Sequence, residues 1–161
     1  MEPIVEIYTD GAASGNPGPG GYGVVLKFAS KRREISEGYR LTTNNRMELL
    51  AVIKGLEALK TNKYPVRVYS DSKYVVDAIN QKWVFGWEQK QFKGKANSDL
   101  WIKFLHVYRL FKNIQFIWVK GHANNVENNR CDELAVAASQ KAIKKIDTFF
   151  EAQKNAENGF L

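Results

Sequence analysis

The order of strand-like and helix-like segments is the feature that most limits the folds open to this chain. Short segments of alternating or β-branched apolar residues come first, and longer segments with apolar residues at helical spacing follow. We predict strands at residues 4–9, 22–28, 34–41, 66–70 and 114–119, and helices at residues 46–60, 73–80, 98–111 and 127–146. Three strands followed by alternating helices and strands predict an α/β fold, with a five-stranded mixed sheet that starts antiparallel and carries helices on both faces.

The chain is expected to form one domain. Its 161 residues are enough for one hydrophobic core, and no repeat or linker divides them. We place the domain at residues 1–146 and expect residues 147–161 to be a loosely ordered tail, because they are polar apart from two adjacent phenylalanines and the final two residues. The stretch from Gly11 to Gly21 is rich in glycine and proline, which predicts a loop after the first strand.

Composition excludes some classes of protein and favours others. Lys and Arg number 24 against 17 Asp and Glu, a net charge of +7 that favours polyanionic partners. Nothing approaches the roughly 18 consecutive apolar residues of a membrane span, and the N-terminus lacks the basic and apolar stretches of a signal peptide. The single Cys131 cannot form an internal disulfide, so a reducing cytoplasm is the simplest expected location.

Two acidic residues stand at the carboxyl ends of predicted strands. Asp10 directly follows the strand at 4–9, and Asp71 directly follows the strand at 66–70. Catalytic groups of α/β sheets gather at such ends, so the two carboxylates would lie side by side if these strands are parallel neighbours. Each also has an ordinary structural explanation, because Asp10 suits a turn and Asp71 suits the cap of the helix that follows.

Two further acidic residues lie within predicted helices. Glu48 shares a helix face with Val52 and Leu59 in the most apolar helix, where a carboxylate is costly unless it is paired or bound to a metal. The spacing Asn45-x-x-Glu48 also fits a capping box, in which Glu48 would bond back to the start of the helix. Asp132 lies at the edge of the inner stripe of the last helix, where it could equally be a solvated acid favoured by the helix dipole.

Four carboxylates from four segments would repel one another if they converged. Like charges at close range raise each other's pKa, and bound divalent cations remove that conflict. Ligation by oxygen alone suits Mg²⁺ or Mn²⁺ and not Zn²⁺. Two such ions a few ångströms apart can hold an attacking water and a leaving oxygen across a phosphodiester.

Five short motifs follow one another in an order typical of one enzyme family. They are Tyr8 to Ala12 (YTDGA) with the glycine-rich run up to Gly21, Thr42 to Leu49 (TTNNRMEL), Tyr69 to Val75 (YSDSKYV), Trp118 to Ala123 (WVKGHA), and Asn128 to Ala135 (NNRCDELA). Together they resemble the bacterial type 1 ribonucleases H (ribonucleases HI), which cut the RNA strand of RNA–DNA hybrids. The resemblance runs from about residue 4 to about residue 145. Any one motif is weak alone, whereas five in this order are specific.

This resemblance implies an activity, a cofactor and catalytic residues. The activity is endonucleolytic hydrolysis by two metal ions, one placing the attacking water and the other stabilising the leaving 3′ oxygen, with 5′-phosphate and 3′-hydroxyl products. The implied ligands of two Mg²⁺ ions are Asp10, Glu48, Asp71 and Asp132, and Mn²⁺ is the expected substitute. His122, which could also be a solvated loop histidine, is implied to assist proton transfer or product release.

The resemblance also implies a surface for an RNA–DNA hybrid. The residues expected to contact substrate are Gly11, Asn16, Thr43, Asn44, Asn45, Lys73, Trp83, Lys90, Lys93, Lys95 and Asn128. A glycine-rich backbone permits close approach to the minor groove. Discrimination of RNA from DNA must come through the 2′-OH, which only one strand carries.

Residues 82–95 combine aromatic and basic side chains. Four lysines and one glutamate give this segment a charge of +3, and Trp83, Phe85, Trp87 and Phe92 are interleaved with them. The segment resembles the family's substrate-binding protrusion in a shorter and less basic form, and a small satellite core with a solvated face would also fit. We expect Trp83 and Trp87 to pack its base while the lysines meet phosphates.

Two alternative functions are also compatible with these residues. A DNA nuclease of related fold, resolvase-like or integrase-like, also uses clustered acids, although Asn16 and the Thr43-Asn44-Asn45 stretch favour a hybrid. A non-catalytic hybrid-binding module would be expected if an acid were missing, and all four are present. The glycine-rich run contains no G-x-x-x-x-G-K-[ST] motif, so we expect no nucleotide cofactor, and a monomer is the predicted state.

Overall fold

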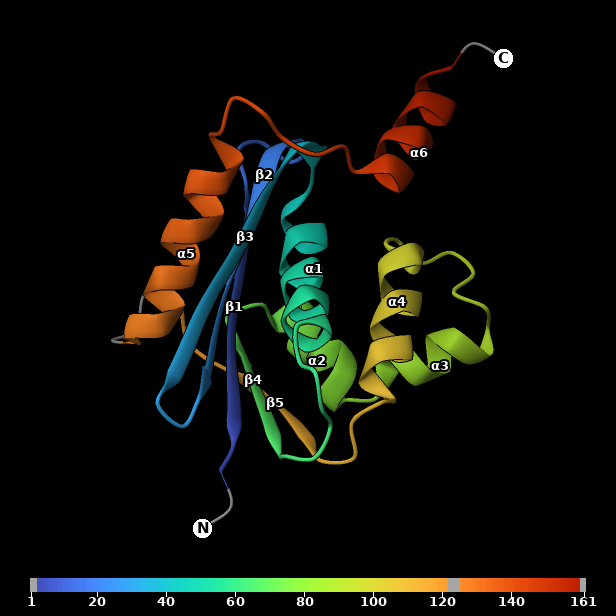
Figure 1. Cartoon of the computed structure of the whole chain (residues 1–161). Coiled ribbons are helices and arrows are strands. Elements are labelled where there is room, and N and C mark those ends of the chain that lie inside the picture. Colours follow the sequence, from blue (N-terminus) through green and yellow to red (C-terminus); the bar gives the residue numbers. More distant parts are fainter. Residues whose placement is uncertain (1–2, 122–124, 160–161) are drawn as a thin grey trace.

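A five-stranded mixed sheet forms the centre of the structure (Figure 1). The computed structural model describes residues 3–121 and 125–159. The strands are β1 (Val5–Ala13), β2 (Gly18–Phe28), β3 (Lys31–Thr42), β4 (Val66–Ser70) and β5 (Ile114–Trp118), and they lie in the order β3-β2-β1-β4-β5. β2 is antiparallel to both β1 and β3, whereas β4 is parallel to β1 and β5 is parallel to β4. The predicted fold class and the antiparallel start of the sheet are confirmed.

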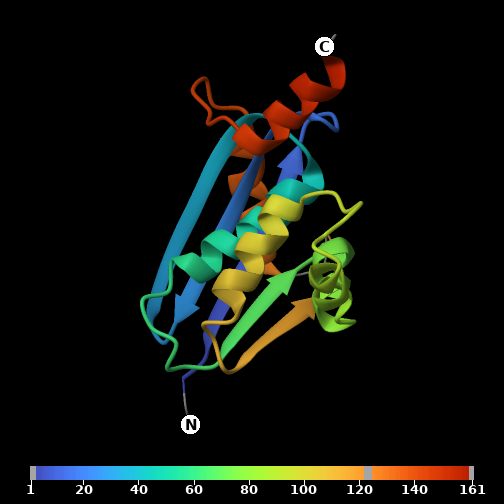
Figure 2. The same cartoon turned by 90° about the vertical axis from the view of Figure 1, so that its right-hand side faces the viewer.

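Helices cover both faces of the sheet, as Figures 1 and 2 show. They are α1 (Asn44–Glu57), α2 (Lys73–Asn80), α3 (Trp83–Gln89), α4 (Ser98–Tyr108), α5 (Val126–Ser139) and α6 (Thr148–Asn158). α5 packs against β1, β2 and β3 on one face, and α1 packs against β1 and β2 on the other, with α4 beside it. Within the described residues, no helix is both long and apolar enough to cross a membrane.

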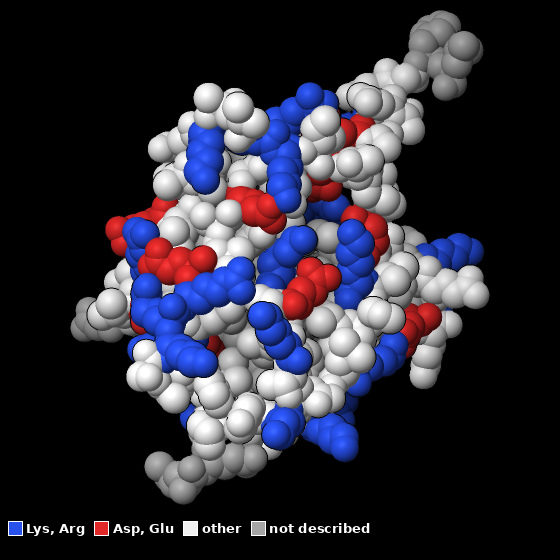
Figure 3. All heavy atoms as spheres, in the orientation of Figure 1, with Lys and Arg blue, Asp and Glu red and all other residues white. Residues whose placement is uncertain are grey.

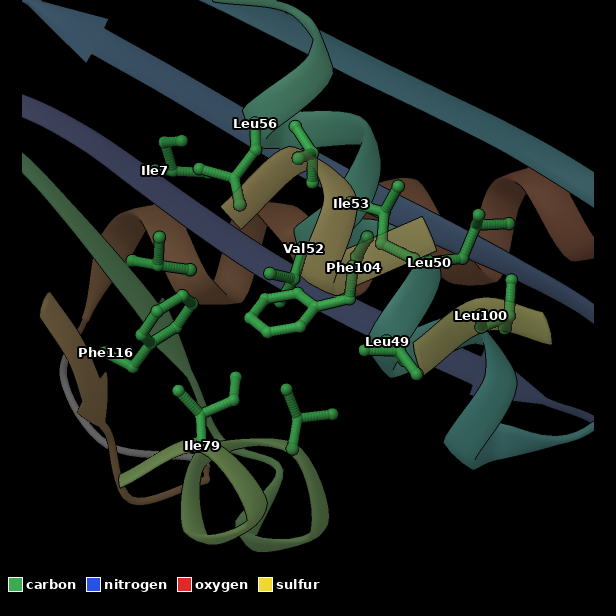
Figure 4. Packing of buried hydrophobic residues seen from close by; sticks show 14 of the residues in the cluster. Ile7, Leu49, Leu50, Val52, Ile53, Leu56, Ile79, Leu100, Phe104 and Phe116 are labelled. Carbon is green, nitrogen blue, oxygen red and sulfur yellow. The ribbon is translucent and has the colours of Figure 1, made fainter. Parts of the chain in front are cut away.

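The main hydrophobic core lies between the sheet and the helices on the α1 side. From Met47 to Ile53, α1 is apolar on nearly every face except at Glu48, so that Val52 and Ile53 are both buried although their side chains point in different directions. Ile7 of β1, Phe116 of β5 and Phe104 of α4 belong to the same cluster (Figure 4). Burying one such side chain contributes about 1.5–3 kcal/mol, so this layer fixes α1 firmly against the sheet.

The glycine-rich stretch after the first strand is not the loop that its composition predicts. β1 and β2 extend into it from both sides, so that only residues 14–17 form a turn. A Cβ atom at Gly21 would lie 2.5 Å from the carbonyl oxygen of Ala135, and one at Gly23 would lie 2.3 Å from that of Cys131. These glycines stand in the strand because α5 packs closely on β2, and not because a turn requires them.

The last predicted helix ends earlier than expected. α5 ends at Ser139, so the predicted helical residues 140–146 lie beyond it. The chain instead runs along the edge of β3, where the N–H of Lys145 donates to the carbonyl of Gly38 and the carbonyl of Lys145 accepts from the N–H of Arg40. These bonds satisfy backbone groups at the sheet edge that a longer helix would leave unpaired.

The segment after Asp147 is helical as far as Asn158, in contrast to the loosely ordered tail expected from its polarity. Phe150 is buried, and Asp147 accepts hydrogen bonds from Arg46 Nε and from the Thr42 hydroxyl, both at 2.7 Å. The two donors lie more than 100 positions earlier in the chain, so the composition of the tail carries no sign of them. α6 is therefore tied to the end of β3 and the start of α1.

Candidate metal centre

Three carboxylates from three different elements meet beside the carboxyl end of β4. Asp10 on β1, Glu48 on α1 and Asp71 after β4 each place a carboxylate oxygen within 4.8 Å of the other two. Asp10 is buried, and the other two are partly buried. The structure thus brings the carboxylate of the apolar helix to the two aspartates that the sequence places near strand ends.

The register of the sheet explains why the two aspartates are neighbours. β1 and β4 run parallel, with Tyr8 opposite Tyr69. Asp10 and Asp71 each follow that pair by two residues, so they reach the same level of adjacent strands. Asp10 does not end its strand as predicted, because β1 continues along β2 as far as Ala13.

Gly11 lets α1 approach β1 closely enough for Glu48 to join the aspartates. A Cβ atom at position 11 would lie 2.3 Å from the backbone nitrogen of Glu48 and 2.4 Å from the carbonyl carbon of Met47. Any side chain there would push α1 away from the strand. Gly11, predicted as a substrate contact, therefore has a packing role that the sequence analysis missed.

The ordinary structural explanations of three acids do not hold. Thr43 caps α1 through its side chain, so Glu48 takes no part in the capping box that its spacing suggests. Ser72 caps α2 and thereby occupies the role considered for Asp71. Asp10 lies inside the β1–β2 ladder and is not a turn residue. The local roles that the sequence suggests for these three acids are thus filled by other residues or absent.

Asp132, the fourth predicted acid, approaches Asp10 and Asp71 from the other face of the sheet. A small cavity of about 50 Å³ is lined by Asp10, Asp71 and Asp132, the last of which is exposed on α5. The remaining lining residues are Val119, Lys120, Gly121, Asn125, Asn128 and Asn129. Because the carboxylate of Asp132 is exposed and Asp71 is only partly buried, a cation can reach the cavity from solvent.

Burial and mutual repulsion raise the pKa values of two of these carboxyl groups. Burial, and then the charge of Asp71, raises the pKa of Asp10 to about 8. Burial, and then the charges of Asp10 and Asp71, raises the pKa of Glu48 well above its usual range. The contact between the side chains of Glu48 and Asp10 lowers the pKa of Asp10 and raises that of Glu48. The cluster must therefore bind either protons or cations.

Two side chains at the site have buried polar atoms without a hydrogen-bond partner among the residues that the structure describes. They are Glu48, through Oε2, and Asn128, through both its amide oxygen and its amide nitrogen. A buried polar atom without a partner costs about 1–3 kcal/mol, so such atoms mark places that an ion, water or ligand completes. Because the converging ligands are carboxylate oxygens, the site fits hard divalent cations such as Mg²⁺ or Mn²⁺.

Two asparagines tie the β1–β2 turn to the start of α1. The side-chain carbonyl of Asn44 accepts from the N–H of Ala13 at 2.6 Å, and that of Asn16 accepts from the N–H of Asn44 at 3.2 Å. Asn44 and Asn45 are in the first turn of α1, and not in front of it as predicted, because Thr43 is the cap. The turn and the start of α1 therefore form one continuous surface, which contains four predicted substrate contacts: Asn16, Thr43, Asn44 and Asn45.

The predicted protrusion contains the short helix α3 on a folded base. Phe92 is buried, and Trp87 packs against Trp101 of α4 with ring centroids 5.6 Å apart. Trp83 is 52% exposed, so the expectation that it packs the base is wrong, and Phe92 takes that place. The three predicted phosphate contacts Lys90, Lys93 and Lys95 are all exposed.

Lys73 and Trp118 flank Asp71. The indole N–H of Trp118 donates to the backbone carbonyl of Asp71 at 3.1 Å, and the ammonium of Lys73 lies 4.8 Å from the centre of the Trp118 ring. A cation over an aromatic face is stabilised by about 0.5–1 kcal/mol at exposed sites. The pair thus steadies the backbone of Asp71.

Arg46 is a buried residue near the site that the sequence analysis missed. Its side chain is 2% exposed and donates to Asp99 at 2.7 and 2.8 Å as well as to Asp147. The available signal was a cation two positions before Glu48, at the start of the apolar run from Met47 to Ile53. His122, predicted as a catalytic residue, lies outside the described residues.

The net positive charge of the chain does not by itself locate a binding surface. On the face shown in Figure 3, Lys and Arg side chains spread over most of the molecule and alternate with Asp and Glu. Particular residues around the carboxylates, and not overall charge, must therefore determine where a nucleic acid would bind.

Comparison with known proteins identifies related sequences. The family model described as RNase H matches residues 2–140. The chain is 55% identical over 148 residues to a ribonuclease H of Syntrophus aciditrophicus, a match that covers 89% of this chain and 84% of that protein. It is 48% identical to a ribonuclease HI of Helicobacter pylori, over 87% of this chain and 96% of that protein.

Solved structures with the same arrangement of elements are also similar in sequence. LC9-RNase H1, described as a type 1 RNase H with the type 2 active-site motif, superimposes with a TM-score of 0.76 at 33% identity, over 86% of this chain and 73% of that one. LC11-RNase H1 in complex with an RNA/DNA hybrid superimposes with a TM-score of 0.67 at 31% identity, over 86% of this chain and 98% of that one.

Proposed function

This chain belongs to the ribonuclease H family, and from that premise we propose that it is a type 1 ribonuclease H, an endonuclease that hydrolyses the RNA strand of RNA–DNA hybrids. The observation that carries the proposal is the meeting of Asp10, Glu48 and Asp71, with Asp132 at the same cavity. The similar structure of LC11-RNase H1 with a bound hybrid supports the substrate. The expected products carry 5′-phosphate and 3′-hydroxyl ends.

The four carboxylates are the proposed ligands of two Mg²⁺ ions, with Mn²⁺ as the alternative. When bound, such a pair of ions lowers the pKa of an attacking water and stabilises a leaving oxygen. The protein contributes by holding Asp10 and Glu48 where their pKa values are raised, so that cations replace protons there. The unpartnered Oε2 of Glu48 supports this fit, because it supplies a buried oxygen with no competing donor among the described residues.

Other residues around the cavity have proposed roles toward the substrate. The amide of Asn128 can donate to a phosphate oxygen or accept from a 2′-OH, and it has no protein partner among the described residues. Asn16, Thr43 and Asn45 would contact sugar and phosphate across the minor groove. His122 would assist proton transfer or product release.

The two alternative functions are disfavoured for different reasons. A nuclease acting on duplex DNA is disfavoured by the match to the RNase H family model over residues 2–140. A non-catalytic hybrid-binding module is disfavoured because all four acids are present and border one site. The predicted monomeric state and the reducing cytoplasm suggested by the single Cys131 belong to the proposal as well.

The test is cleavage of three end-labelled duplexes, RNA–DNA, DNA–DNA and RNA–RNA, with Mg²⁺ or with EDTA. We expect only the hybrid to be cut, only in its RNA strand, only with Mg²⁺, and with 3′-hydroxyl ends. Asp132→Asn should lose activity, whereas Glu133→Gln, a matched change at the next and 65% exposed position of α5, should retain it. Cleavage of DNA duplex with the hybrid left intact, or 2′,3′-cyclic phosphate products, would overturn the proposal.

A further inference from the structure

Helix α6 lies beside the surface formed by the β1–β2 turn and the start of α1 (Figure 2). A cavity of about 350 Å³ has Asn16, Thr43 and Asn45 on one wall and Gln153 and Lys154 of α6 on the other. The first three residues are those to which the proposed function assigns sugar and phosphate contacts. The C-terminal helix therefore faces the same space as the substrate surface.

Contacts on both sides of its first turn hold α6 in this place. Phe150 is 8% exposed, and the guanidinium of Arg40 donates to both carboxylate oxygens of Glu151 at 2.8 and 2.9 Å. Gln153 and Lys154 follow these anchors by three residues each, so they lie on the same side of the helix one turn later. Their position next to the cavity is thus fixed by the packing of the helix.

The α6 wall carries the chemistry that a nucleic-acid backbone needs. Gln153 offers an amide donor, and Lys154 offers an ammonium group whose ion pair with Glu157 measures 3.5 Å, between side chains that are 37% and 65% exposed. Exposed pairs of this kind contribute little to stability, so a phosphate can take the place of the carboxylate. Lysine ammonium groups and side-chain amides are common donors to phosphate oxygens, together with arginine and hydroxyl groups.

We propose that α6 extends the substrate-binding surface, with Lys154 binding a backbone phosphate and Gln153 donating to a phosphate or sugar oxygen of the strand that lies over Asn16, Thr43 and Asn45. The inference rests on the proposed function, because it takes the hybrid as the ligand. The contact lies on the opposite wall from the turn and does not involve the four carboxylates. It therefore acts on substrate affinity and not on the chemical step.

The test compares Lys154→Ala and the double variant Gln153→Ala/Lys154→Ala with Lys63→Ala, which removes a lysine from the connection before β4. Hybrid binding is measured by fluorescence anisotropy in an Asp10→Asn background over a range of salt, and cleavage is measured in the otherwise unchanged chain. Lys154→Ala should raise Kd and KM about threefold to tenfold, leave kcat unchanged and lower the salt slope by about 0.9, the effect of removing one lysine–phosphate interaction. Lys154→Arg should behave as the original chain.

Binding of Lys154→Ala that equals that of Lys63→Ala in both Kd and salt slope would overturn the inference, as would tighter binding. Urea unfolding of each variant checks that α6 stays attached. If the unchanged chain neither binds nor cuts the hybrid, the proposed function itself fails. If it cuts the hybrid and Lys154→Ala cuts it with the same KM, only the role of α6 fails.

Discussion

Replacing Gly23 with alanine tests whether close packing of α5 on β2 positions Asp132 at the candidate metal centre. The added Cβ would lie 2.3 Å from the carbonyl oxygen of Cys131 and 2.8 Å from Cβ of Leu134. Because non-bonded heavy atoms prefer separations of about 3.5–4 Å, α5 must move by about 1 Å to admit it. Cys131 directly precedes Asp132, so the displaced turn of the helix carries a proposed metal ligand with it.

The expected change in the free energy of unfolding combines two opposing effects. Overpacking of this kind destabilises by about 1–3 kcal/mol, while the reduced freedom of the unfolded chain offsets about 0.4–1 kcal/mol of that cost. We therefore expect Gly23→Ala to lower the free energy of unfolding by about 1–2 kcal/mol. A displacement of about 1 Å at a reacting centre can reduce the rate by about 100-fold, so kcat/KM should fall roughly tenfold to 100-fold.

Urea unfolding measures the loss of stability, and hybrid cleavage across a Mg²⁺ titration measures the loss of activity. The matched control is Gly86→Ala on α3, where an added Cβ meets no atom within 4 Å. That change should stabilise the helix by about 0.5–1 kcal/mol and leave cleavage unaltered. If Gly23→Ala has the stability and the Mg²⁺ dependence of the unchanged chain, then α5 does not position the centre by close packing, and the reasoning fails.

Three further predictions concern charge. In EDTA, the free energy of unfolding should fall as pH rises from about 4 to about 8, because the pKa of Asp10 is raised on folding and the stability that its protonated form contributes is lost over that window. Urea unfolding at several pH values measures this slope, and Asp10→Asn should remove much of it. An unaltered slope in that variant would contradict the pKa argument. Arg46→Met should lower the free energy of unfolding by about 3–5 kcal/mol in the same assay, because it leaves the buried Asp147 without its cation. Exchanging Asp147 for Asn in that variant should restore part of the stability. No recovery would show that loss of this ion pair is not the cause. Alanine at Lys90, Lys93 and Lys95 should weaken hybrid binding and lower its salt slope by about 0.9 for each lysine that binds a phosphate, whereas an unchanged slope would exclude the protrusion as a phosphate-binding element.

Local patterns were sufficient to predict the strands and the central helix, and to single out Asp10, Glu48 and Asp71, which the structure brings close together. The apolar runs that end near Asp10 and Asp71 belong to adjacent parallel strands, and the alternation of segments led to the right sheet. The position of Glu48 followed from the cost of a carboxylate in an apolar helix. These inferences succeeded because each depends on residues a few positions apart.

Interactions between distant segments were beyond such reasoning. The polar segment after α5 has the composition of a loose tail, yet Arg46 and Arg40 bind Asp147 and Glu151 across more than 100 positions. The glycine-rich sequence of β2 resembles that of a loop, because a glycine that permits a turn and a glycine that permits close helix packing cannot be told apart in the sequence. Only the pairing of β1 with β2 distinguishes the two.

The glycine positions and the acid positions are aspects of one arrangement. Gly11 allows α1 to lie against β1, which brings Glu48 to Asp10, and Gly23 allows α5 to lie against β2 on the other face, which brings Asp132 to the same cavity. Carboxylates placed this close are unfavourable without cations, as the raised pKa values of Asp10 and Glu48 show. The buried layer around Val52 and Ile53 supplies the free energy that holds α1 in place against this repulsion. Beneath α5 lies a smaller buried cluster, formed by Tyr8, Val25 and Cys131, so the placement of the exposed Asp132 depends more on backbone contact between α5 and the sheet.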